Sequence, residues 1–160
     1  MKQALLLILA ALGAGCRTPA TYDENSFAFV IPRGSKLVLS RPVNIPDANA
    51  HIKFQHGRPV GGVDEYSVNC QFRTKNLGPQ DIQADIFLIT NAGDGEEWVS
   101  APHTRRFFKN LFLHSDKQPE VRTMICQIWA PPLWGRSISV PQMREALGDY
   151  FSFEFPQVGR

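Results

Sequence analysis

A strict alternation of apolar and polar residues over positions 66–73, Tyr-Ser-Val-Asn-Cys-Gln-Phe-Arg, most constrains what this chain can fold into. A period of two is that of a β-strand, whose successive side chains point to opposite faces. The apolar members of this segment share one face: Tyr66, Val68, Cys70 and Phe72. Such a strand fits an antiparallel sheet with one face on a core and one face in water. We therefore expect Cys70 to point into the core.

Further apolar runs predict other strands of the same sheet. They cover residues 104–114, residues 121–129 with Cys126, and residues 150–155, where phenylalanine alternates with polar residues. The segment 91–95, Asn-Ala-Gly-Asp-Gly, is typical of a hairpin turn. The acidic residues at 94, 96 and 97 would then form a solvated rim around that turn. Many short strands favour an antiparallel β-sandwich or an open barrel.

One helix is expected near the C-terminus. Ser139 is a suitable N-cap, Gln142 completes the pattern of a capping box, and Pro141 lies in the first turn. The helix would end at Leu147, because the glycine that follows is a natural stop. The predicted fold class is therefore all-β or a β-rich α+β domain with this single helix.

The first residues have the composition of an export signal. Lys2 precedes the apolar segment 4–12, which is shorter than the roughly 20 residues that a spanning helix needs. The sequence Leu-Gly-Ala-Gly-Cys at 12–16 resembles the lipobox of bacterial lipoproteins, although the usual leucine is displaced by one position. This resemblance implies that residues 1–15 are removed and that Cys16 is lipidated. The alternative is ordinary signal cleavage near Ala20 without lipidation.

The lipoprotein resemblance also implies a location. In such proteins an aspartate after the lipidated cysteine tends to retain the protein in the inner membrane, and residue 17 is an arginine. We therefore expect an outer-membrane protein that faces the periplasm and contacts the membrane through its lipid anchor. Residues 16–25 would form a tether, and residues 26–160 a single periplasmic domain.

The cysteine count supports a disulfide. If Cys16 carries lipid, Cys70 and Cys126 are left as a pair. An exported protein lies in an oxidising compartment, where two such thiols are expected to form a bond. The alternative is a pair of free thiols in the core.

Four stretches together resemble a known family: residues 31–57, 64–72, 112–129 and 139–153. The family consists of small exported or lipid-anchored proteins of proteobacteria without an assigned activity. Its most specific parts here are Tyr-x-x-x-Cys, which ends at Cys70, and Met-x-Cys, which ends at Cys126. The resemblance implies a protein of the cell envelope, and it implies no catalytic residues.

Several function classes are disfavoured. Lysine and arginine form no stripe and the formal net charge is +2, which argues against a nucleic-acid partner. We expect no cofactor and no metal, with the histidines in solvated loops. A small periplasmic hydrolase or metal-dependent enzyme is the alternative, and it would require three residues to converge: His51, His56 and Asp64.

The leading expectation is a non-enzymatic accessory or binding module of the envelope. The rigid segment 129–136, Trp-Ala-Pro-Pro-Leu-Trp-Gly-Arg, is a candidate surface for an envelope protein partner, because tryptophan and arginine are enriched at interfaces. Its candidate contact residues are Trp129, Trp134 and Arg136. The alternative is that Trp129 ends a core strand and Trp134 covers the sheet edge. We expect the cations Arg105, Arg106 and Lys109 on a solvated face.

Overall fold

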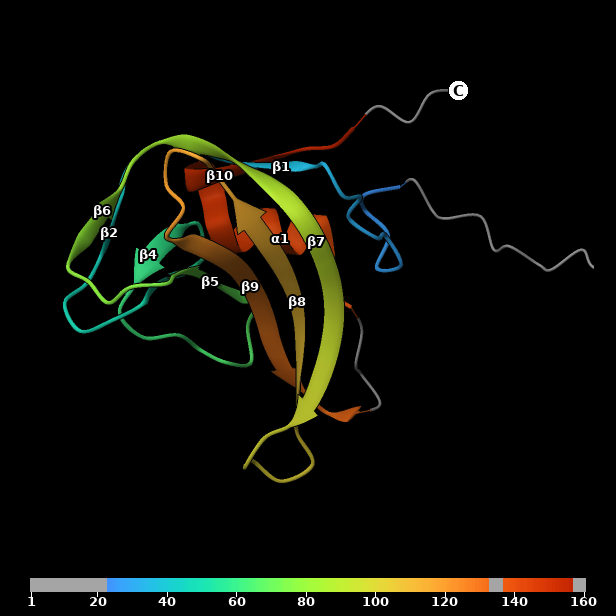
Figure 1. Cartoon of the computed structure of the whole chain (residues 1–160). Coiled ribbons are helices and arrows are strands. Elements are labelled where there is room, and N and C mark those ends of the chain that lie inside the picture. The colour runs from blue at the N-terminus through green and yellow to red at the C-terminus, as the bar shows by residue number, and fades with distance from the viewer. Residues whose placement is uncertain (1–22, 133–136, 157–160) are drawn as a thin grey trace, which may run out of the picture.

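The structure is a computed structural model, and it describes residues 23–132 and 137–156. One antiparallel sheet contains eight strands, in the spatial order β10 (Phe151–Glu154), β1 (Lys36–Leu39), β7 (Asp85–Trp98), β8 (Arg105–His114), β9 (Val121–Ala130), β5 (Asn69–Thr74), β3 (His51–Gln55) and β4 (Arg58–Val60). The sheet curls into a half-barrel around the helix α1 (Val140–Leu147), as Figure 1 shows. This confirms the β-rich class with an antiparallel, barrel-like sheet and a helix near the C-terminus.

A second, smaller sheet pairs β2 (Val43–Ile45) with β6 (Gln80–Ile82). Ile45 faces inward from β2 and Ile82 from β6, and both side chains are fully buried. They belong to the same apolar cluster as the residues of the large sheet. The two sheets therefore share one core.

The helix α1 begins where the sequence predicts. The Gln142 side-chain oxygen accepts a hydrogen bond from the Ser139 backbone N–H at 3.0 Å, which satisfies one of the free donors at the helix start. Gly148 follows the helix with a φ of 57° and opens the short 3-10 helix η2 (Gly148–Tyr150). Glycine adopts a positive φ without steric cost, so the chain can turn sharply into β10 there.

The concave side of the half-barrel holds an aromatic core. The ring of Phe151 lies 5.4 Å from that of Phe54 and 5.1 Å from that of Phe72, and all three side chains are buried. Met143 and Leu147 of α1 are fully buried in the same cluster. The helix therefore forms the second layer that covers the apolar face of the sheet.

The alternating segment at 66–73 becomes β5, but the strand starts later than predicted. Cys70 and Phe72 are fully buried, as the pattern requires. The alternation predicts that Tyr66 faces the core, but Tyr66 precedes the strand and is 57 % exposed. The alternation places Asn69 on the wet face, yet it is fully buried. It lies opposite Gln127 of β9, and its side-chain amide donates to the Ser67 carbonyl oxygen and the Glu65 carboxylate.

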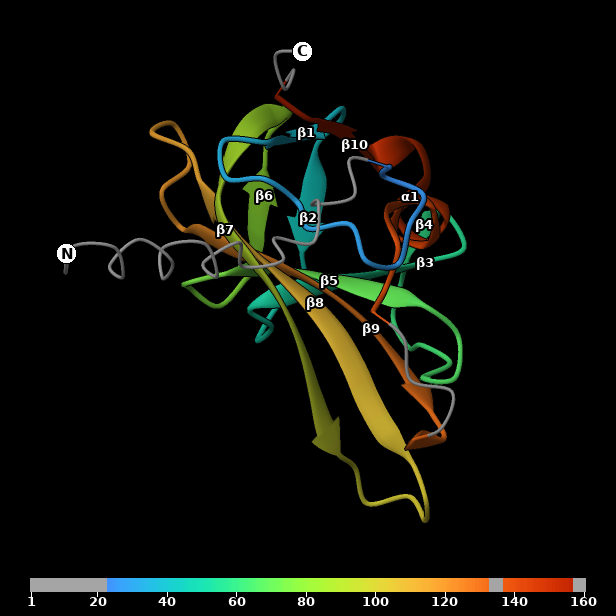
Figure 2. The ribbon, with the colours of Figure 1, turned by 90° about the vertical axis from the view of Figure 1, so that its right-hand side faces the viewer.

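The distal half of the β7–β8 hairpin extends away from the helix, together with the end of β9, which pairs with β8 as far as Ala130. We call residues 91–110 the arm, and Figure 2 shows it projecting beyond the helix and the small sheet. Strand β7 pairs with β8 as far as the Trp98–Arg105 pair. The predicted turn at 91–95 is therefore wrong: those residues lie inside β7, and the chain turns at 99–104.

A charged contact joins the first described residues to the helix. The two terminal guanidinium nitrogens of Arg144 donate to the carboxylate of Glu24, at 2.7 and 3.0 Å. Such a two-bond fork fixes orientation as well as distance. The segment that leads into the domain is therefore attached to α1.

Candidate functional site

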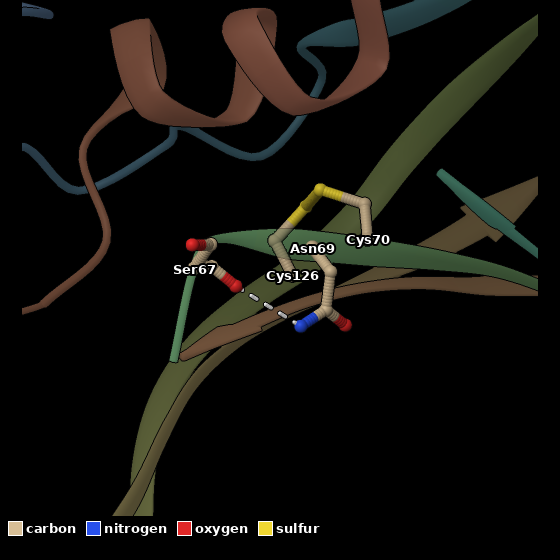
Figure 3. Close-up of a disulfide and its surroundings, with 4 residues drawn as sticks. All are labelled: Ser67, Asn69, Cys70 and Cys126. Carbon is tan, nitrogen blue, oxygen red and sulfur yellow. Dashed lines mark hydrogen bonds between the residues drawn. A yellow bond between two sulfur atoms is a disulfide. The ribbon is translucent and has the colours of Figure 1, made fainter. Parts of the chain in front are cut away.

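A disulfide joins Cys70 of β5 to Cys126 of β9, as predicted. The two residues are directly opposite one another in the paired strands, and both are fully buried. Figure 3 shows the bond on the side of the sheet that faces α1, while the adjacent Asn69 points to the other side. The bond therefore crosslinks two neighbouring strands within the core.

Trp129 is the part of the predicted partner surface that the structure describes. It lies near the end of β9, and its ring packs edge-to-face against Tyr66 with centroids 6.0 Å apart. Its backbone N–H donates to the Glu65 carbonyl oxygen at 2.7 Å. Its indole N–H is buried and has no acceptor within the described part of the chain. Trp134 and Arg136 lie outside the described residues, as does Cys16.

A chain of polar side chains crosses the convex face beside Trp129. Gln127 donates to the Glu65 carboxylate at 2.7 Å and accepts from the Arg106 guanidinium at 2.6 Å. Arg106 in turn donates to Glu97 at 2.6 Å. This convex-face network links β7, β8 and β9 to the segment before β5. Sequence reasoning missed it, because its members are far apart in the chain.

Ion pairs between β7 and β8 run along the arm. Lys109 pairs with Asp94 at 2.7 Å, although the lysine side chain is only 3 % exposed. The two other pairs of the arm are Arg105 with Glu96 and Arg106 with Glu97. The acidic residues are therefore not a solvated turn rim, and the cations do not lie on a free face as predicted.

The Asp94 carboxylate is a junction between the arm and the segment before α1. The Ser137 hydroxyl donates to the same oxygen that Lys109 contacts, at 2.6 Å. Lys109 itself lies opposite Cys126 in the strand register. A buried lysine next to an apolar disulfide needs this carboxylate, because an unpaired charge there would be costly.

The proposed metal ligands are not brought together. His51 is the first residue of β3, and His56 follows its last residue. At about 3.3 Å per residue, their backbones are separated by roughly 16 Å. The Asp64 carboxylate accepts from the Tyr66 N–H and the Ser67 hydroxyl. Within residues 23–132 and 137–156, no group of three histidine, cysteine, aspartate or glutamate side chains is placed to hold a metal.

A small cavity of about 220 Å³ lies between α1 and the start of β5. Its lining combines polar groups from three elements with small apolar ones: His56, Ser67, Val68, Gln142, Glu145 and Ala146. Beside it, the Gly57 N–H donates to the Ala146 carbonyl oxygen at 3.1 Å, which closes the β3–β4 turn onto the helix. The cavity is thus a gap at a packed turn, with room for a few waters.

Two groups on the body of the sheet have shifted pKa values. Burial lowers the pKa of His51, and the nearby charges of Lys53 and Arg73 lower it further. Burial alone would raise the pKa of Asp85. Hydrogen bonds from the side chains of Ser115 and Gln118 and from the Ile86 backbone N–H outweigh burial. The net result is a lowered pKa of Asp85.

Comparison with known proteins identifies no relative: no protein-family model, curated protein sequence or solved structure matches this chain significantly. Across residues 23–132 and 137–156, none of the helices has the length and apolar character needed to cross a bilayer.

Proposed function

We propose that this protein is a lipid-anchored binding module of the bacterial cell envelope, attached through Cys16 to the outer membrane and facing the periplasm. The observation that carries the proposal is the fully buried Cys70–Cys126 disulfide. Disulfides persist in oxidising compartments and are rare in the cytosol. The bond therefore supports export, which the apolar segment before Cys16 independently suggests.

The arm supports a binding role. Trp98 stands at its end with 62 % of its surface exposed, and the Arg105 guanidinium lies 4.3 Å from the centre of its ring. Exposed aromatic and arginine side chains are enriched where proteins meet partners. A projecting part of the sheet that ends in such a pair is suited to contact another molecule.

Fractionation of a Gram-negative host that expresses the full chain tests the anchor. The unmodified protein is expected in the outer-membrane fraction, and Cys16→Ser is expected in the soluble periplasm. Arg17→Asp keeps the anchor and should shift the protein to the inner membrane. Intact mass should show acyl chains on Cys16 and no free thiol at Cys70 or Cys126.

Two results would contradict the proposal. One is an unchanged distribution of Cys16→Ser between the fractions. The other is a mature protein that retains its initiator methionine and has reduced cysteines throughout. Either result would place the domain outside the class of anchored envelope proteins.

A further inference from the structure

The arm leaves one edge of β7 without a partner strand. β1 pairs with β7 from Asp85 to Leu88. The last backbone bonds at this edge are those of Ile89, whose N–H donates to the Ser35 carbonyl oxygen at 2.7 Å and whose carbonyl oxygen accepts from the Gly34 N–H at 3.0 Å. From Asn91 to Trp98, β8 occupies one edge, and no strand of the described residues pairs with the other. This outer edge is about 25 Å long, and exposed edges of that kind are templates for an added strand.

The strand register shows which backbone groups face the outer edge. The Cα atoms of Cys70 and Cys126 are 4.0 Å apart, a spacing typical of a pair that exchanges no backbone hydrogen bonds. The backbone groups of Cys126 therefore point to β8, and those of Lys109 point back to β9. Those of Asp94, opposite Lys109, point away from β8. With the alternation of a strand, four residues present both N–H and C=O outward: Ala92, Asp94, Glu96 and Trp98.

Charge disfavours a second copy of this chain as the occupant. When the outer edges of two copies pair antiparallel with full overlap, the pairing is symmetric about residue 94, 95 or 96. Each of these registers places Asp94 or Glu96 directly opposite an acidic residue of the second copy. Like charges directly opposite one another destabilise a strand pair. The edge is therefore better matched to a strand of different sequence.

The same acidic residues define what such a strand should carry. Asp94 and Glu96 each contact one cation of β8, yet about half of each side chain stays exposed, 45 % and 51 %. A carboxylate has two oxygens and accepts several hydrogen bonds, so each can bind a second cation. A partner strand with basic side chains at the two facing positions would supply these cations.

The residue between these two positions should be apolar. Gly95 has no side chain, and the ring of Phe108 lies over it, where an added Cβ would come within 2.4 Å of the ring. A partner side chain opposite Gly95 would lie next to this ring. An aliphatic side chain there would bury apolar surface on both sides.

We propose that the outer edge of β7 binds an extended segment of another protein by antiparallel strand addition, with basic side chains facing Asp94 and Glu96 and an aliphatic side chain facing Gly95. This inference rests on the proposed role as a binding module, but it does not require the lipid anchor. In strand addition the backbone bonds supply affinity and alternate side chains supply specificity.

The probe is the labelled peptide acetyl-STTKVKVTS-amide, whose lysines face Glu96 and Asp94 in the proposed register. Its binding to the full chain in detergent is measured by fluorescence anisotropy. We expect saturable binding, and binding weaker by about tenfold when both lysines are replaced by glutamate. Because Cys16→Ser should bind the peptide equally well, this result does not depend on the anchor.

Backbone methylation of the peptide tests the hydrogen-bonding direction. The N–H of the lysine opposite Asp94 points to β7, so its methylation should weaken binding by about tenfold. The N–H of the valine opposite Gly95 points to solvent, and its methylation should change affinity by less than about twofold. Equal effects of the two methylations would overturn the proposal.

Two matched substitutions test the charge. Glu96→Gln and Glu97→Gln each remove an ion pair with an adjacent arginine of β8, but only residue 96 shares a face with the peptide lysines. Glu96→Gln should weaken binding by about fivefold and Glu97→Gln by less than about twofold. No saturable binding, or a concentration-dependent dimer of the chain that the peptide cannot compete with, would refute the proposed occupant.

Discussion

The body of the half-barrel and the arm share strands β7 and β8, yet they differ in what covers their concave side. In the body, α1 lies over the sheet, and the side chains between them are apolar and buried. In the arm, which extends past α1, the concave positions of β7 and β8 hold the pairs Asp94–Lys109 and Glu96–Arg105. The same alternation of a strand therefore leads to an apolar core beneath α1, and to ion pairs beside the buried ring of Phe107 in the arm.

The disulfide belongs to the body, and its loss should have the largest effect. It closes a sequence separation of 56 residues, so its removal in Cys70→Ala/Cys126→Ala is expected to lower the free energy of unfolding by about 4 kcal/mol. Denaturant unfolding checks this value. Cys16→Ser serves as the control and should leave the free energy of unfolding unchanged. A loss below about 1 kcal/mol would mean that the crosslink does not stabilise the domain.

Removing apolar contacts should lower the free energy of unfolding more in the body than in the arm. Met143 of α1 is fully buried, and Met143→Ala should cost about 3 kcal/mol of unfolding free energy. Trp98 in the arm is mostly exposed, and Trp98→Ala should cost less than about 1 kcal/mol. Thermal and denaturant unfolding of both variants provide the measurement. Similar losses would show that the arm is packed as tightly as the body.

The ion pairs of the arm should differ in how much each contributes to the free energy of unfolding. Asp94→Asn leaves the buried Lys109 without its anion and should lower the free energy of unfolding by about 2 kcal/mol. Glu96→Gln affects a half-exposed pair and should cost less than about 1 kcal/mol. If the order of the two losses were reversed, the buried lysine would not depend on Asp94.

The smallest effect is a pH dependence located in the body. The pKa of Asp85 is lowered, so the charged carboxylate stabilises the folded state above its unfolded pKa of about 4. That contribution is lost as the pH falls through the lowered pKa. Asp85→Asn should therefore be less stable than the parent near neutral pH and approach it in acid. A difference that stays constant from neutral pH down to about pH 3 would contradict this assignment.

Local patterns predicted the body better than the arm. The alternation at 66–73 located β5 and the buried Cys70, and the capping pattern at Ser139 located α1, because both signals are short-range. The sequence Asn-Ala-Gly-Asp-Gly at 91–95 has strong turn propensity, but long-range contacts override it. Lys109 pairs with Asp94 and the ring of Phe108 covers Gly95, so the glycines stay in an extended strand.

The candidate site was hardly visible in the sequence. The convex-face network joins Glu65 to Gln127, which are 62 residues apart. The outer edge of β7 depends on strand lengths. It exists because the pairing with β1 stops at Leu88, whereas β7 continues to Trp98. Neither feature has a local pattern. Of the predicted surface residues, Trp129 is near the network, and the structure does not describe the other two.

The fork between Arg144 and Glu24 has a mechanical consequence for a tethered domain. On the anchor proposal, six residues separate Cys16 from the first described residue, and fully extended they would span at most about 20 Å. Tension on the lipid would act on α1 through this fork before it reached β1, which begins at Lys36. Breaking the Glu24–Arg144 contact would lengthen the tether, and with it the distance from the bilayer that the arm can reach.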